Sequence, residues 1–429
     1  METKNKIKKI AVAVAAALLA GSAAAADVTL YGVVDTGFSY TNTRSKVEGN
    51  GTSSKFGPQS DKQTQSTKSF SMDSGNSAGS RWGLKGSEDL GNGLKVGFKL
   101  ESGFSSDTGK GSDDGLFNRE SSISLSGSFG TIYAGRMGSL ISDVGSVGWY
   151  GSMASPFGSG WGKIAGHEAV MHMQGRKNNT LVYMSPRFSG LQFSAQYSMG
   201  DEGKENKPST DRYAAIGVDY QVGGLEIGFL VDWMNKDSSE LNYGEDLAKL
   251  AANYGADTAK IDKDAWTINL AANYDCGFAK TFIAAQYFKN TSLNQSLTSA
   301  KNQIAPIAKI LGIDGVDETK ATEDIARLAS AKGFGVNLGV DVPAFGGNAM
   351  LSVGYEDADL RIAKRKVASA DVYSALAGYT YPISKRTSVY AGAGYTYNKL
   401  KASHEGKITG SGKIKGSVFQ AMAGLKHTF

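Results

Sequence analysis

The chain of 429 residues has little cysteine, proline or histidine, and after residue 26 it has no long apolar run. A single cysteine, Cys276, excludes an internal disulfide bond. No later stretch approaches the 18 apolar residues that a transmembrane helix needs. Four histidines leave few partners for a nucleophile–base site, and His167 and His172 are one residue too far apart for the zinc motif H-E-x-x-H. We therefore expect no enzyme activity, no cofactor and no bound metal.

Residues 1–26 have the pattern of a secretory signal peptide. Four lysines precede an apolar run from Ile10 to Ala20, and Ala24-Ala25-Ala26 offers a small-residue cleavage site before Asp27. The apolar run is too short for a membrane anchor. Without this leader the chain has 42 Lys and Arg against 40 Asp and Glu, so its charge indicates no nucleic-acid partner. We expect an exported mature chain of residues 27–429.

What the sequence has in abundance is alternation with a period of two. In residues 94–101 apolar side chains at even positions alternate with Lys95, Lys99 and Glu101. In residues 265–274 Trp266 and Tyr274 bound an apolar face that would extend about 20 Å along a membrane normal. A soluble β-sandwich alternates too, but it needs neither aromatic ends nor very long loops. The pattern predicts strands with one face toward lipid and the other toward water.

Short and long connections alternate between these segments. The long connections are expected at 42–79, 138–177, 235–264 and 289–333, and residues 246–254 and 322–332 have helical patterns within the last two. An even number of strands with short turns at one end and long loops at the other is typical of outer-membrane barrels. The sequence therefore predicts an all-β fold, a 16-stranded antiparallel transmembrane β-barrel with short periplasmic turns and long external loops. The sixteen expected strands are 28–41, 80–87, 94–104, 117–127, 130–137, 178–186, 191–199, 212–221, 224–234, 265–274, 279–288, 334–342, 348–357, 370–381, 387–397 and 417–429.

Several stretches together resemble the Gram-negative general porins. They are DVTLYGVVDTGFSY (27–40), GSRWGLKGSEDLGNGLKVGFKLESGF (79–104), FNRESSISLSGSFGTIYAGR (117–136), LVYMSPRFSG (181–190), YPISKRT (381–387) and the terminal GLKHTF (424–429). The resemblance implies a homotrimer in the outer membrane, in contact with lipid and lipopolysaccharide. It also implies passive diffusion of ions and small hydrophilic solutes, with a third external loop (about 138–177) folded into the lumen. Terminal Phe429 resembles the signal read by the barrel assembly machinery.

Inward parity on the first strands gives the candidate pore-lining residues. Arg81, Lys85 and Lys99 form a basic wall, and Asp35 and Glu101 share their face. The resemblance adds Arg136, which a bend at Gly135 would turn into the lumen. The third loop has Ser155 before Pro156-Phe157, where relatives tend to carry an acidic residue. Asp143 and Glu168 are its only carboxylates. The acidic residues expected on the opposite wall are Asp219, Glu226, Asp232, Asp341 and Glu356.

With few carboxylates in the third loop, the basic wall predicts a weak preference for anions. Two alternatives remain open: a substrate-preferring outer-membrane channel, and a surface adhesin built on a barrel. A saccharide channel would need a row of aromatic side chains along the lumen, and inward parity offers Tyr31 alone among mostly charged residues. The general diffusion channel is the leading hypothesis.

Overall fold

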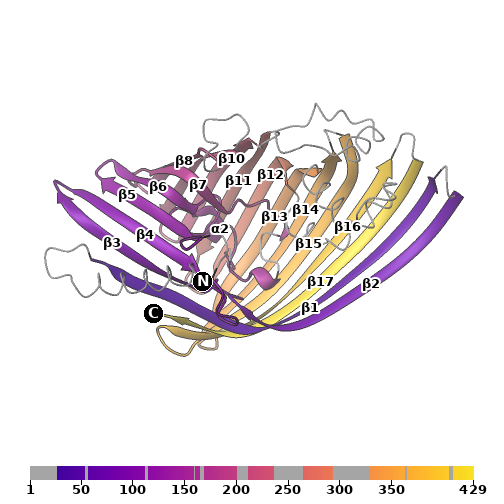
Figure 1. The fold of residues 1–429 in the computed structure, drawn as a ribbon, viewed down its shortest axis with the longest axis horizontal. Helices are drawn as coiled ribbons and strands as arrows, with labels where there is room; N and C mark the ends of the chain where they lie inside the picture. Colours follow the sequence, from indigo (N-terminus) through magenta and orange to yellow (C-terminus); the bar gives the residue numbers. More distant parts are fainter. Residues whose placement is uncertain are drawn as a thin grey trace, which may run out of the picture.

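The computed structural model describes residues 27–53, 57–111, 115–158, 160–164, 169–200, 211–235, 264–292, 329–362, 365–404 and 409–429. The expected leader (1–26), the expected helix at 246–254 and Glu168 lie outside the described residues. The described chain is dominated by one antiparallel sheet that curves around a central space (Figure 1). No helix in these ranges is long and apolar enough to cross a membrane.

Seventeen strand segments make up the sheet. Their bounds are β1 Thr29–Ser53, β2 Gly57–Ser74, β3 Arg81–Gly91, β4 Leu94–Gly103, β5 Glu120–Gly127, β6 Gly130–Gly138, β7 Arg176–Met184, β8 Leu191–Ser198, β9 Arg212–Val222, β10 Leu225–Asn235, β11 Asp264–Asp275, β12 Lys280–Thr291, β13 Ala329–Ala344, β14 Gly347–Ile362, β15 Arg365–Pro382, β16 Thr387–His404 and β17 Thr409–Thr428. A short helix, α2 (Tyr150–Ala154), and a 3-10 turn, η1 (Gly162–Ile164), lie in the connection between β6 and β7.

The seventeen segments form sixteen strands around a closed ring. β2 pairs with the upper part of β1, from Thr36 to Ser53, and β3 then pairs with its first residues, Thr29–Val33. β2 and β3 are thus one strand interrupted at 75–80. Consecutive strands pair from β3 to β17, and β17 pairs with β1. The predicted 16-stranded antiparallel barrel is confirmed, and its closure leaves no open edge within the ring.

The burial pattern is the reverse of that of a soluble sheet. On β11 Ile268, Leu270 and Tyr274 are exposed, whereas Thr267 and Asn269 on the opposite face are buried. Large apolar side chains are exposed in the same way on the outward faces of most other strands. An apolar outer surface around a polar interior suits a wall that separates lipid from water. The predicted division of faces on this strand is therefore confirmed.

Two predictions about the long connections are wrong. Most of the expected loop 42–79 is the hairpin formed by the end of β1 and by β2, which reaches beyond the barrel wall (Figure 1). The expected helix at 322–332 does not extend to its end, because residues from Ala329 onward pair with β14 in strand β13; residues 322–328 lie outside the described part. The end of β1 and the first part of β2, up to Lys68, are polar on both faces, so they carry no apolar alternation to reveal them. The last part of β2 does alternate, with Phe70 and Met72 exposed.

Candidate functional site

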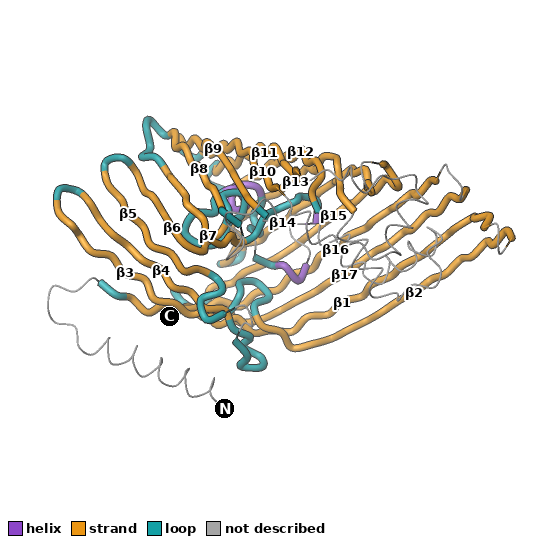
Figure 2. Tube along the Cα trace, turned by 45° about the horizontal axis from the view of Figure 1, so that its top comes forward, coloured by secondary structure: helices purple, strands orange, loops and turns teal. Residues whose placement is uncertain are grey.

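The connection between β6 and β7, residues 139–175, lies among the strands rather than beyond their ends (Figure 2). It leaves β6 at a break in the ladder: Gly135 has a φ of 130°, and the register shifts between Gly135 and Met137. Such a bulge redirects the chain. The Leu140 amide then donates to the side chain of Gln196 on β8, at 2.9 Å. The connection is thereby attached to the inner face of the wall from its first turn.

A set of wall glycines provides the space into which this connection packs. A Cβ atom at any of them would come within 3 Å of an atom of the connection, which no ordinary contact allows. The aromatic and aliphatic side chains that occupy the space include Trp149, Phe157, Trp161, Ile164 and Val170. The glycines therefore leave room for the loop to pack closely against the inner face of the wall. The glycines are Gly217, Gly228, Gly335, Gly339, Gly354, Gly378, Gly392 and Gly394.

Polar contacts hold the same connection at α2 and near its end. The Tyr150 hydroxyl, whose pKa is raised by burial, donates to the Leu270 carbonyl at 3.2 Å. The Asn337 side chain donates to the Ala154 carbonyl at 3.1 Å. Farther on, the His172 amide donates to Gln286, and its ring lies against that of Phe288 on β12 with the planes tilted by 38°. The loop is thus fixed against β11 to β13 by hydrogen bonds as well as by apolar packing.

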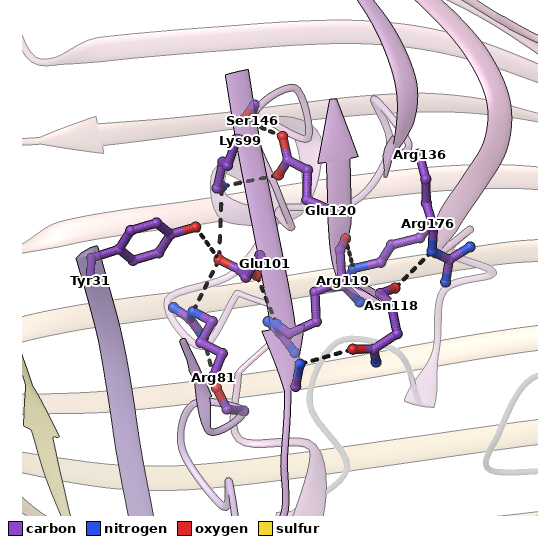
Figure 3. Close-up of polar contacts among 12 residues, drawn as sticks. Tyr31, Arg81, Lys99, Glu101, Asn118, Arg119, Glu120, Arg136, Ser146 and Arg176 are labelled. Atoms are coloured by element: carbon purple, nitrogen blue, oxygen red, sulfur yellow. Dashed lines mark hydrogen bonds and ion pairs between the residues drawn. The ribbon is translucent and has the colours of Figure 1, made fainter. Parts of the chain in front are cut away.

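Opposite this loop lies a cluster of charged side chains (Figure 3). We call it the basic cluster. It contains five cationic side chains and two carboxylates, so cations exceed carboxylates by three. Its members come from β3 to β7 and the residues just before β5. They are Arg81, Lys99, Arg119, Arg136, Arg176, Glu101 and Glu120.

Glu101 is the centre of the basic cluster. Its carboxylate lies 2.8 Å from the Arg119 Nε, 3.6 Å from the Arg81 Nε and 3.9 Å from the Lys99 Nζ, and the side chain is only 4% exposed. The Tyr31 hydroxyl donates to it at 2.9 Å. A buried carboxylate needs such partners, because an unpaired charge is costly away from water. Glu101 therefore fixes the positions of the cations around it.

Glu120 and the remaining arginines connect the cluster to its surroundings. Lys99 lies 3.0 Å from Glu120, which also accepts a hydrogen bond from Ser146 of the loop. Arg136 donates to the Asn118 carbonyl at 2.8 Å and to Asn178. Arg176 donates to the Arg119 carbonyl at 2.6 Å. The backbone between β4 and β5 thus serves as the scaffold on which two arginines are oriented.

A cavity of about 820 Å³ separates the basic cluster from the loop. Arg81, Lys99, Arg119 and Arg176 contribute to its lining from the wall, with Glu101 among them. Loop residues around 142–145, 160–162 and 171–175 line the other side. The geometry is that of a water-accessible passage with an excess of positive charge on one wall. Among the described residues no group of His, Cys, Asp and Glu has the arrangement of a metal site.

The sequence-predicted site residues are not all in this passage. Arg81, Lys99 and Glu101 line it, whereas Arg136 belongs to the basic cluster but is not among the residues that line the cavity. Lys85 is exposed nearby, with its Nζ 5.4 Å from the centre of the Tyr31 ring.

Asp35 does not line the pore. It is fully buried, and accepts hydrogen bonds from the Ser77 amide and hydroxyl, the Ala78 amide and the Tyr390 hydroxyl. It holds the interruption at 75–80 against the inner wall, so its expected place in the lumen is wrong.

Asp143 lies in the loop and lines the cavity, as expected of a loop carboxylate. Phe429 ends the chain beside β1, where its backbone exchanges two hydrogen bonds with Gly32 at 3.0 and 3.1 Å. Its ring lies over Gly32, where any side chain would collide with it.

The sequence analysis missed Arg119, Glu120 and Arg176. All three lie at or just outside strand ends, where alternation with a period of two does not tell whether a side chain faces the lumen or lipid. Two features of the sequence could have indicated them: the dipeptide Arg119-Glu120, in a stretch that resembles the porins, and the basic pair at the start of β7.

Two of the five acidic residues expected on the opposite wall are paired with cations. Asp219 pairs with Arg187 at 2.5 Å, and Glu226 with Lys280 at 3.4 Å. Asp232 is buried and accepts from Tyr213 and Thr267. Local pairs of this kind contribute little field at a distance.

The remaining two members of that set are also engaged. Glu356 is buried, with the His172 Nε2 3.7 Å away, and Asp341 accepts from Asn348 at 2.9 Å. The acidic wall is therefore weaker than its residue count indicates.

Comparison with known proteins agrees with this architecture. The family model described as Gram-negative porin matches residues 11–401. An outer membrane porin protein of Bordetella pertussis is 32% identical over 90% of this chain and 93% of its own length. Outer membrane porin protein 32 of Delftia acidovorans is 26% identical over 99% of this chain and all of its own. Among solved structures, the anion-selective porin from Comamonas acidovorans has a TM-score of 0.59 and 21% identity, covering 94% of this chain and all of that one. The chain therefore belongs to the Gram-negative porin family and forms a channel in the outer membrane.

Proposed function

We propose that this porin is a weakly anion-preferring diffusion channel whose narrowest part lies between the loop 139–175 and the basic cluster. The excess of three positive charges in the cluster is the observation that supports the preference. Fixed charges on one wall of a narrow, water-filled passage raise the local concentration of ions of opposite sign. One similar structure is described as anion-selective, but that likeness concerns the fold, and the proposal rests on the charges of this chain.

The guanidinium groups have donors to offer to passing anions. Glu101 engages the Nε atoms of Arg119 and Arg81, and both of these side chains line the cavity. Guanidinium groups bind carboxylate and phosphate well, and weak binding at several adjacent groups is compatible with rapid passage. Ions and small hydrophilic solutes are the expected cargo.

The test is the reversal potential in a KCl gradient across a planar bilayer. Wild-type protein should give a chloride-to-potassium permeability ratio above one. The double variant Arg81→Ser with Arg136→Ser should lower that ratio toward one or below, since it removes two of the three excess charges. Lys385→Ser, in an exposed turn away from the cluster, is the control and should leave the ratio unchanged. A strongly cation-selective wild type, or a double variant with an unchanged ratio, would contradict the assignment.

We also propose how the channel is exported, how it assembles and what it contacts in the membrane. Residues 1–26 are a signal peptide, and the mature chain begins at Asp27, as its small-residue cleavage pattern supports. The mature chain assembles as a homotrimer through an outward face of the barrel, in contact with phospholipid and lipopolysaccharide. Phe429 is the residue read by the barrel assembly machinery. Intact mass of the purified protein and its native mass in detergent test the first two statements.

A further inference from the structure

Each of the seven short turns of the barrel carries a large, exposed apolar side chain in the turn or directly beside it. Turns of water-facing hairpins are usually built from Gly, Asn, Asp and Ser, whose backbone and hydrogen-bonding properties suit them. One exposed apolar residue in a single turn would need no explanation, but all seven turns have one. We call this set the turn rim. Its members are Leu90, Phe129, Phe188, Val222, Phe278, Phe345 and Ile383.

The turn between β13 and β14 shows that the apolar residue is not there for the turn itself. Phe345 and Gly346 form a two-residue loop in which both φ angles are positive, 52° and 79°. Such loops favour Asn-Gly, because a side chain with a bulky ring is strained in the left-handed region. Phe345 is nevertheless 94% exposed, so packing of its ring within the described chain does not offset the strain.

Tyrosines on the outer wall hold two members of the turn rim in the same way. The Tyr183 hydroxyl, on β7, donates to the Phe129 carbonyl in the turn between β5 and β6, at 2.8 Å. The Tyr379 hydroxyl, on β15, lies 3.0 Å from the Phe345 carbonyl in the turn between β13 and β14. In both cases the tyrosine is on the strand that follows the hairpin. These turns are therefore held against the outward, lipid-facing side of the barrel and not over the lumen.

We propose that the turn rim inserts into the interfacial region of the inner, phospholipid leaflet of the outer membrane. It is continuous with the lipid-facing surface: Tyr183 and Tyr381 are 40% and 44% exposed on the outer wall, and Tyr381 lies next to Gly346 in the turn. Short turns mark the periplasmic end of such barrels, which selects the leaflet. Aromatic rings favour the boundary between headgroups and acyl chains. The turn rim lies beyond the strands, so it extends the membrane contact past the ends of the wall.

Site-directed spin labelling measures this directly. Cys276 is the single cysteine, so a Cys276→Ser background allows one nitroxide at Phe345→Cys, at Phe129→Cys, or at the control Lys385→Cys, an exposed polar position in a turn of the same end. The protein is reconstituted in vesicles of phosphatidylethanolamine and phosphatidylglycerol. We expect the collision rate with oxygen, relative to that with a water-soluble nickel chelate, to be several-fold higher at 345 and 129 than at 385. Equal ratios at the three sites would overturn the proposal, and so would an immobilised label shielded from both reagents, which would indicate a protein contact such as a second copy.

A substitution with opposite expectations provides the second test. Phe345→Asn creates Asn-Gly, the preferred sequence for this turn, so turn chemistry alone predicts a higher urea midpoint of unfolding. If the ring is inserted in lipid, the same variant should instead have a lower midpoint in vesicles. A midpoint that rises or stays the same in vesicles would contradict insertion. Lys385→Asn, which changes an exposed residue of a neighbouring turn, should leave the midpoint unchanged.

Discussion

Adding a single methyl group to the wall at Gly339 should narrow the channel. A Cβ atom at this position would lie 2.5 Å from Cδ of Pro156, whereas ordinary contact begins at 3.4 Å, so the loop must move by about 0.9 Å. Because Pro156 is a ring fused to the backbone, a side-chain rotation cannot relieve the overlap. The displacement is directed away from β13 and into the passage. We expect Gly339→Ala to lower single-channel conductance and to cost about 1–3 kcal/mol of stability, as overpacking usually does.

Planar-bilayer recording and a thermal unfolding series on detergent gels measure the two effects. Gly111→Ala is the control, because Gly111 lies outside the loop and the cavity lining and a Cβ there meets nothing within 4 Å. If Gly339→Ala and Gly111→Ala had the same conductance and the same transition temperature, the loop would not be seated on the wall as described. An increase in conductance would show that the loop detaches instead of shifting, and it would refute the reasoning as well.

Three further predictions concern buried charge and the chain end. Asp35→Asn should lower the free energy of unfolding by about 1–3 kcal/mol, and with it the unfolding temperature, because an amide nitrogen would face backbone or hydroxyl donors where a carboxylate oxygen now accepts from them. An unchanged transition temperature on detergent gels would exclude this role. Glu101→Gln should raise the chloride-to-potassium permeability ratio, since the excess in the basic cluster grows from three to four, and a lower ratio would show that the order Glu101 imposes outweighs its charge. Deletion of Phe429 should reduce insertion in cells far more than its apolar contact, about 1–3 kcal/mol, would explain; equal amounts of wild type and variant in outer-membrane fractions would reject the assembly signal.

The parts of the fold that could be predicted are those where the two faces of a strand meet different solvents. Thr267 and Ile268 on β11 differ in polarity because one faces the interior and the other faces lipid, so the alternation of polarity along the sequence shows which face each residue occupies. The same reasoning fails for the end of β1 and the first part of β2, where polar residues stand on both faces of the strand. It fails again at the basic cluster: Arg119 precedes its strand, and Arg136 follows a bulge that interrupts the alternation. Residues at strand ends and bulges are positioned by tertiary contacts, and these contacts leave no regular pattern in the sequence.

The pairing of β17 with β1 has a consequence for biogenesis. Phe429 bonds to Gly32, so the seam of the ring joins residues separated by nearly the whole chain. Contacts at such a distance along the sequence form late, because the entropy of closing the intervening loop must be overcome first. A truncated or still-emerging chain therefore lacks the partner that would cover β1, and its strand edges stay available for pairing with other chains. Strand β17 must accordingly be present before the ring can close, so folding of the complete barrel waits for the strand that lies farthest from β1 along the sequence.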